Sequence, residues 1–177
     1  MVTESTTQRP AKELLFNALI QSNSQFQLFQ TLPMVQGMTE SHAMTIFSSM
    51  EEERFEEGDI IYSAGTKTSG KMYLILSGKV TVADINGHDY TKLGAGDVFG
   101  LFSFLDEKRN HSATIQAADS LIVLTLERNY FNLIRLEDPK LAQHVMYFMF
   151  RLLSEKALKM ETEYAHMHQF ALGGRHK

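Results

Sequence analysis

The sequence predicts a mainly β protein: an antiparallel β-roll of the jelly-roll type, with helices before it and a long helix after it. Three observations predict this class. The hydrophobic pattern has a helical period over roughly 11–50, a period of two over about 53–126, and a helical period again toward the C-terminus. Turn residues break the middle zone at short intervals, as in sandwiches and barrels. No helix long enough for a parallel crossover lies between the predicted strands, which disfavours a parallel sheet.

The N-terminal zone is predicted to be helical. Leu15, Ala18 and Leu19 follow helical spacing, and Pro33 interrupts the pattern. Thr39 is a suitable N-cap for a further helix, because its hydroxyl can accept a hydrogen bond from a free backbone N–H of the first turn.

The middle zone contains short segments with strand character. Lys79–Asp84 alternates between apolar and polar residues, as a half-buried strand does. Asn86-Gly87 follows it and predicts a hairpin with a type I′ turn, in which both central residues have positive φ. Three other segments are predicted as strands: Asp59–Tyr62, Met72–Leu76 and Ser120–Leu126.

The C-terminal zone is helical again. A short amphipathic helix is predicted over Asn129–Glu137, and Asp138-Pro139 then supplies an N-cap and a proline at the first helical position. Nothing interrupts the helix until about Gln169, which gives it roughly 30 residues and a length of about 45 Å. The chain is thus divided into an N-terminal extension, a β-roll domain and a dimerisation helix, over 1–25, 26–137 and 138–172.

Composition limits the classes of function. The formal net charge is −4, whereas a general nucleic-acid binder needs a basic face. Cysteine is absent, which excludes disulfides, thiol catalysis and cysteine-ligated metal. The longest strongly apolar stretch, 144–150, is far shorter than the roughly 20 residues of a membrane span, and the N-terminus lacks the apolar centre of a signal peptide. We expect a cytoplasmic protein with neither nucleic-acid nor membrane partners.

Five segments carry a family resemblance. Met72–Val80 contains Tyr-x-Ile-x-x-Gly-x-Val, and Leu93–Gly100 contains Leu-x-x-Gly-Asp-x-Phe-Gly. Together with Leu28–Pro33, Phe55–Ile61 and Ser112–Ala117, in this order, they resemble the cyclic nucleotide-binding domain family, which includes the β-roll of the catabolite activator protein. The resemblance implies the β-roll fold and a regulatory function.

The resemblance also implies where a ligand would bind. In the family, backbone N–H groups at the start of a short helix and one arginine hold the cyclic phosphate, and a glutamate binds the ribose 2′-hydroxyl. The ligand-binding residues implied here are Val98, Phe99, Gly100, Leu101, Phe102, His111, Ser112, Ala113 and Thr114.

Two residues depart from the family pattern where the ligand is recognised. Leu101 replaces the glutamate and His111 replaces the arginine, while Arg109 is out of register by two residues. Losing one charge-assisted contact costs about 1.5–3 kcal/mol, or roughly ten- to a hundredfold in affinity. Phe102 and Phe104 add apolar bulk that can fill the pocket. We expect weak or no binding of cAMP or cGMP, with another small anionic ligand and an empty or self-filled pocket left open.

The last helix carries an apolar stripe that is longer than one domain requires. Met149, Leu153, Met160 and Tyr164 are assigned to a contact between two copies, because an exposed apolar row on a long helix needs a partner surface. The resemblance points the same way, since the corresponding helix pairs in catabolite-activator-like dimers. We expect a homodimer, with an unidentified protein as a further partner.

The favoured function is a non-enzymatic regulatory or sensor module, with no cofactor unless a cyclic nucleotide binds. One alternative is a functional receptor for a cyclic nucleotide or another small anion. Another is a catabolite-activator-like transcription regulator without its own DNA-binding domain, since about a dozen residues after Ala165 are too few for a helix-turn-helix. A cupin-like enzyme is disfavoured, because the β region offers only His88 and His111 as histidine ligands.

Metal binding is not expected at the C-terminal end either. His166 and His168 are two residues apart and so face different sides of a helix, and His176 lies farther on.

Overall fold

Two antiparallel sheets form the centre of the protein. The computed structural model describes residues 8–173 of the chain, with side chains described for 15–170. One sheet has the order β1-β8-β3-β6, with bounds Glu51–Phe55, Leu121–Glu127, Lys71–Ser77 and Val98–Phe99. The other has the order β2-β7-β4-β5, with bounds Ile60–Tyr62, Thr114–Ala117, Val80–Ala83 and Asp89–Leu93. Every strand pair is antiparallel, which confirms the predicted β-roll.

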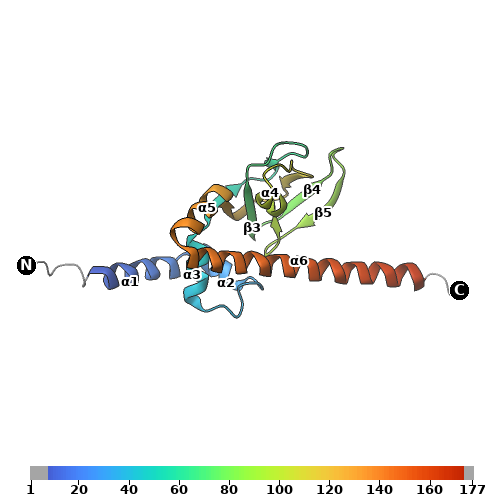
Figure 1. Ribbon diagram of the computed structural model, residues 1–177. Helices are drawn as coiled ribbons and strands as arrows, with labels where there is room; N and C mark the ends of the chain where they lie inside the picture. The colour runs from blue at the N-terminus through green and yellow to red at the C-terminus, as the bar shows by residue number, and fades with distance from the viewer. Residues whose placement is uncertain (1–7, 174–177) are drawn as a thin grey trace, which may run out of the picture.

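Helices precede and follow the roll, as predicted. Those before it are α1, α2 and α3, at Gln8–Gln21, Ser24–Thr31 and Glu40–Ser48. A short helix, α4 at Leu101–Leu105, connects β6 to the segment before β7. The chain continues from β8 into α5 at Arg128–Glu137 and then α6 at Pro139–Gly173. In Figure 1 the roll lies above α6, and α1 and the end of α6 extend in opposite directions.

Two predicted helix starts are confirmed by their capping bonds. The Thr39 hydroxyl accepts the backbone N–H of His42 at 3.3 Å. The Asp138 carboxylate accepts the backbone N–H of Leu141 at 3.0 Å, and Pro139 is the first residue of α6. Each cap satisfies a donor that the first helical turn leaves free.

The β4–β5 hairpin is confirmed, but its predicted type I′ turn is wrong. Gly87 has φ +82°, whereas no other residue type has a positive φ within 8–173, so Asn86 does not fit that turn. The Asp84 carboxylate instead accepts the backbone N–H groups of His88 at 2.9 Å and Asn86 at 2.8 Å. These bonds, that of His88 above all, lower the pKa of Asp84. A side-chain cap therefore closes a longer loop here.

Strand β3 separates two apolar cores. Its side chains alternate, so Tyr73 and Ile75 face the space between the sheets. Met72, Leu74 and Leu76 face a second core, which α2, α3, α5 and α6 complete. Because both faces are covered, the strand is a continuous apolar run and not an alternating one.

Helix α6 packs on the domain along its first half only. Ala142, Val145, Phe148, Met149 and Leu152 are buried in the helical core. Beyond residue 156 every described side chain of the helix is exposed, and Figure 1 shows this part running past the strands. No helix within the described chain is both long and apolar enough to cross a membrane.

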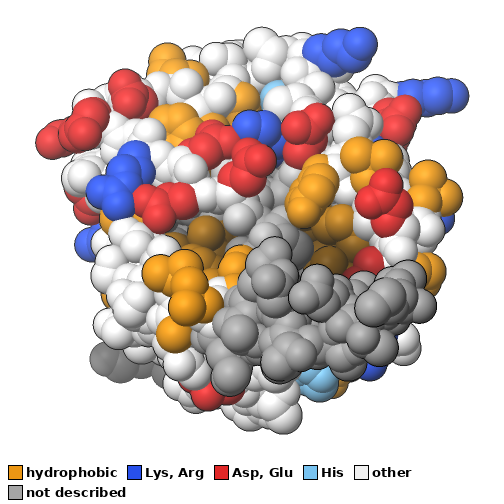
Figure 2. Space-filling model, turned by 90° about the vertical axis from the view of Figure 1, so that its left-hand side faces the viewer, with side chains coloured by type: hydrophobic (Ala, Val, Ile, Leu, Met, Phe, Trp, Pro, Cys, Tyr) orange, Lys and Arg blue, Asp and Glu red, His pale blue; other side chains and the backbone are white. Residues whose placement is uncertain are grey.

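The end of the molecule formed by α1 and α5 exposes apolar side chains. Figure 2 shows them on this face, with acidic and basic side chains interspersed above. Leu15, Phe16 and Leu19 of α1 and Leu133 and Leu136 of α5 are exposed. Helix α1 therefore contributes little to the core over the part whose side chains are described.

Candidate functional site

The chain enters the implied ligand site through a glycine turn. Gly100 has φ +74° and ends β6 just before α4. A Cβ at this position would lie 2.6 Å from the Lys71 carbonyl oxygen and 3.1 Å from Cδ2 of Tyr73. The close approach to β3 and the left-handed backbone both require glycine.

The side chains of α4 do not face the interior of the roll. Leu101 is 5% exposed and packs in the helical core with Val98 and Phe104. The Phe104 ring lies 5.9 Å from that of Phe131 on α5, and Phe102 is 64% exposed. The expectation that Phe102 or Phe104 fills the pocket is therefore wrong, because the helix turns one outward and the other into the helical core.

His111 lies in the interior of the roll. Its side chain stacks on Tyr62, with ring centroids 3.7 Å apart and planes at 11°, and only 4% of the residue is exposed. The backbone N–H of His111 donates to the Thr66 carbonyl at 2.9 Å, and the backbone carbonyl of His111 accepts the N–H of Gly65 at 2.7 Å. Its Nδ1 lies 3.4 Å from the Ser103 hydroxyl. The backbone thus fixes the imidazole against the turn that follows Tyr62.

Both stacked rings are uncharged at neutral pH. Burial lowers the pKa of His111, because the imidazolium would lose its hydration. Burial also raises the pKa of Tyr62 far above its usual range, and nearby Tyr73 adds to this rise. The nearby backbone amide of Gly100 partly opposes this rise in the pKa of Tyr62.

An aromatic cluster surrounds this stack. Tyr73 and Phe99 stack with centroids 4.7 Å apart and planes at 6°, and Tyr62 lies 6.1 Å and 6.0 Å from them. Sequence reasoning missed Tyr62 and Tyr73 as site residues. The strand alternation could not place Tyr62, because the β2–β7 pairing shifts register between Ile60 and Tyr62.

The remaining implied residues lie at the start of β7. Ser112 is exposed, and Ala113 is buried in the core between the sheets. The Thr114 hydroxyl accepts the backbone N–H of Ala64 at 3.0 Å. Phe99, His111 and Ala113 therefore share the interior of the roll, whereas Val98, Leu101, Phe102 and Ser112 do not.

Neither arginine near α4 reaches the interior. Arg109 is half exposed, and its Nε lies 3.8 Å from a carboxylate oxygen of Asp106. Arg128 holds the other end of α4: its Nε donates to the Phe104 carbonyl at 2.6 Å, and its Nη2 donates to the Ser103 carbonyl. Its guanidinium thus satisfies two carbonyls at the end of this helix.

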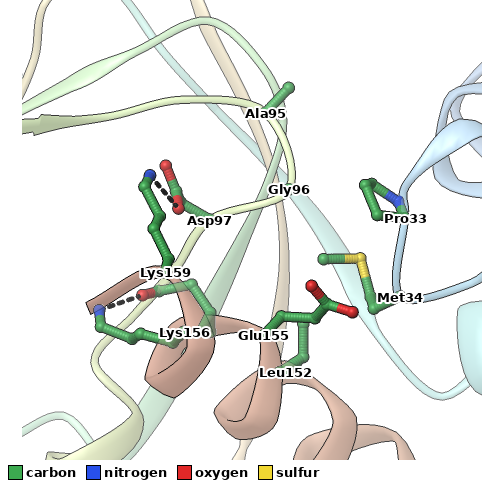
Figure 3. A pocket seen from close by; sticks show the side chains of 10 residues that line it. Pro33, Met34, Ala95, Gly96, Asp97, Leu152, Glu155, Lys156 and Lys159 are labelled. Carbon is green, nitrogen blue, oxygen red and sulfur yellow. Dashed lines mark hydrogen bonds and ion pairs between the residues drawn. The ribbon is translucent and has the colours of Figure 1, made fainter. Parts of the chain in front are cut away.

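A separate cleft of about 200 Å³ lies on the helix side of the domain, between α6 and the turn before β6 (Figure 3). Lys156 Nζ donates to the Val98 carbonyl, and Lys159 Nζ pairs with an Asp97 carboxylate oxygen, each at 3.3 Å. Both contacts are drawn in Figure 3, where Glu155 also borders the cleft. These lysines join α6 to the strand that leads into Gly100.

Within the described residues, no three histidine, aspartate or glutamate side chains gather as a metal site would require. His88 is exposed at the hairpin, while His111 is buried. His166 and His168 are exposed on α6, and His176 lies outside the described residues.

Comparison with known proteins agrees with this geometry. The family model of the cyclic nucleotide-binding domain matches residues 52–138. A cyclic AMP receptor protein of Thermus thermophilus is 26% identical over 133 residues, which cover 73% of this chain and 61% of the relative. The chain thus spans about three fifths of the length of that relative.

Solved structures share the fold. A cyclic nucleotide-binding domain from Methylobacillus flagellatus aligns with TM-score 0.63 and 20% identity, covering 81% of this chain and 80% of that one. The catabolite activator protein of Thermus thermophilus aligns with TM-score 0.54 and 25% identity, covering 75% of this chain and 63% of that one.

Proposed function

Residues 52–138 match the family model of the cyclic nucleotide-binding domain, and from this premise we propose that the chain is a non-enzymatic regulatory module with weakened recognition of cyclic nucleotides. It acts as a homodimer held by α6. The observation that carries the proposal is the buried, uncharged stack of His111 on Tyr62, at the place where the family pattern has an arginine.

The chemistry of the site supports weak binding. A cyclic phosphate carries one negative charge, and moving it out of water requires a compensating cation or several hydrogen bonds. His111 is neutral, and Arg109 pairs with Asp106 outside the roll. Among the residues that the resemblance implies, an anion would therefore meet aromatic rings and no cationic side chain.

Calorimetric titration with cAMP and cGMP tests this proposal. We expect no saturable heat, or a Kd above about 10 µM, which corresponds to a binding free energy weaker than about −7 kcal/mol. Sub-micromolar binding by the unmodified protein overturns it.

The site cannot be repaired by restoring both family residues. Leu101 is buried in the helical core, so glutamate at this position would place a charge among apolar side chains. Leu101→Glu is expected to destabilise the fold, and His111→Arg is the informative change.

The dimer proposal rests on two neighbouring stripes of α6. Met149 is buried in the core of its own domain, so it is not available to a second copy. A second row lies about 100° around the helix from Met149, and its side chains are exposed or only partly buried. Its members follow each other at spacings of four and three: Met146, Phe150, Leu153, Ala157, Met160, Tyr164 and Met167.

This spacing is that of a two-stranded coiled coil. We therefore propose that the row packs against the same row of a second copy of the chain. A parallel arrangement also sets Glu163 opposite His168 of the other copy, at the positions that flank the contact between two such rows.

A further inference from the structure

We infer that the side chains of Tyr62 and His111 occupy the ligand site of the roll, in place of a nucleotide, and order α4 without any ligand. The inference rests on the proposed function and adds a regulatory consequence to it: the module holds its ligand-site helix in a fixed position in every condition.

The stack is held in place from both sides. Tyr62 ends β2, and the turn after it is joined to the backbone of His111 by two hydrogen bonds, of 2.7 and 2.9 Å, through Gly65 and Thr66. One residue of the turn, Ala64, also donates to the Thr114 hydroxyl at 3.0 Å. The Tyr62 ring cannot leave His111 without a rotamer change inside a packed aromatic cluster, which makes the contact a persistent one.

The chain itself contacts α4 from two sides. On the side of the stack, His111 Nδ1 lies 3.4 Å from the hydroxyl of Ser103 on α4, and the Tyr62 hydroxyl lies near the Gly100 amide. At its end, Arg128 donates to the carbonyls of Ser103 and Phe104, and the Thr68 hydroxyl donates to the Ser103 carbonyl at 3.3 Å. These contacts hold the short helix against the stack and against α5 without a ligand.

The first experiment removes the internal occupant. Binding of cAMP is measured by calorimetry for His111→Arg and for the double variant Tyr62→Ala with His111→Arg. In the single variant the Tyr62 ring still fills the site, so we expect binding to stay weak. The double variant gains both the arginine cation and the space that the Tyr62 ring had filled. We therefore expect it to bind cAMP at least about tenfold more tightly than the single variant.

The outcomes separate this inference from the proposed function. Equal affinity of the single and double variants, or no binding by either, overturns the inference and leaves weakened recognition standing. Sub-micromolar binding by the unmodified protein overturns both. Circular dichroism and thermal melting establish that each variant is folded before it is titrated.

A milder change tests the contact with α4 directly. Tyr62→Phe keeps the ring and removes the hydroxyl that the Gly100 amide faces. We expect hydrogen exchange at Gly100 and over Leu101–Leu105 to become several-fold faster. Tyr147→Phe on α6, where the tyrosine is exposed, is the matched control and leaves this exchange unchanged. Unchanged exchange in Tyr62→Phe overturns the inference.

Discussion

Gly100 shows at the scale of one residue how tightly the ligand-site loop is built. Its φ of +74° disfavours any L side chain, and a Cβ there would lie 2.6 Å from the Lys71 carbonyl oxygen. Backbone atoms of a central strand cannot give way as the end of a flexible side chain can. The structure thus requires glycine at this position of the resembled pattern, while Leu101 and His111 replace the glutamate and arginine of that pattern.

Gly100→Ala is predicted to destabilise the protein by about 2–4 kcal/mol, because the positive φ and the close contact both penalise a Cβ. Urea unfolding measures the change. Gly94→Ala is the matched control, since Gly94 lacks a positive φ and a Cβ there would meet nothing within 4 Å. The control should stay within about 0.5 kcal/mol of the unmodified protein. Equal stability of the two variants would contradict this account.

At the scale of elements, Arg128 joins α4 to the start of α5. Its backbone N–H donates to the Gly70 carbonyl at 2.9 Å, while its guanidinium holds the carbonyls of Ser103 and Phe104. The side chain is only 16% exposed, so these carbonyls have little access to water if it is removed. A displacement of α4 would therefore be transmitted to α5 and from there to α6.

Arg128→Lys is predicted to cost about 1.5–3 kcal/mol in urea unfolding, because a lysine ammonium cannot reproduce the planar fork of the guanidinium. Hydrogen exchange over α4 should accelerate in the same variant. Arg135→Lys provides the control: Arg135 is exposed on α5 and bonds Asn132 of the same helix. A loss in the control as large as in Arg128→Lys would show that the effect is not local to α4.

At the scale of the whole molecule, the two halves of α6 have different surroundings. Its 35 residues span about 50 Å, whereas the domain covers only the first half. Among the described side chains of α6, Lys156 and Lys159 form the hydrogen bond and the ion pair to the roll that lie farthest along the helix, with Val98 and Asp97. The apolar row beyond them, with Tyr164 and Met167 exposed, is a surface that monomers rarely keep.

Phe150→Glu with Met160→Glu is predicted to convert the dimer into a folded monomer. Both side chains are exposed on one copy, at 66% and 62%, so the charges do not disturb its core. Light scattering at tens of micromolar reports the mass, and circular dichroism reports the fold. Thr162→Glu, on the opposite face of α6, is the control and leaves the dimer intact. A monomeric mass for the unmodified protein would refute the proposed dimer contact through α6.

The sequence by itself determined the architecture. Periodicity separated helical from strand zones, and Thr39 and Asp138-Pro139 marked helix starts, because caps and repeats depend on neighbouring residues alone. Five ordered segments pointed to the family whose model matches residues 52–138, and the replacements at Leu101 and His111 were visible in the same segments.

Only the tertiary structure decided what these replacements do. A register shift in β2 brings Tyr62 onto His111, about 50 residues away along the chain, and no local pattern encodes that meeting. Likewise, Met149 and Phe150 are neighbours in sequence and equally apolar, yet one packs on the domain and the other is exposed. Local spacing establishes that a face is apolar; which surface covers that face depends on how distant elements are brought together.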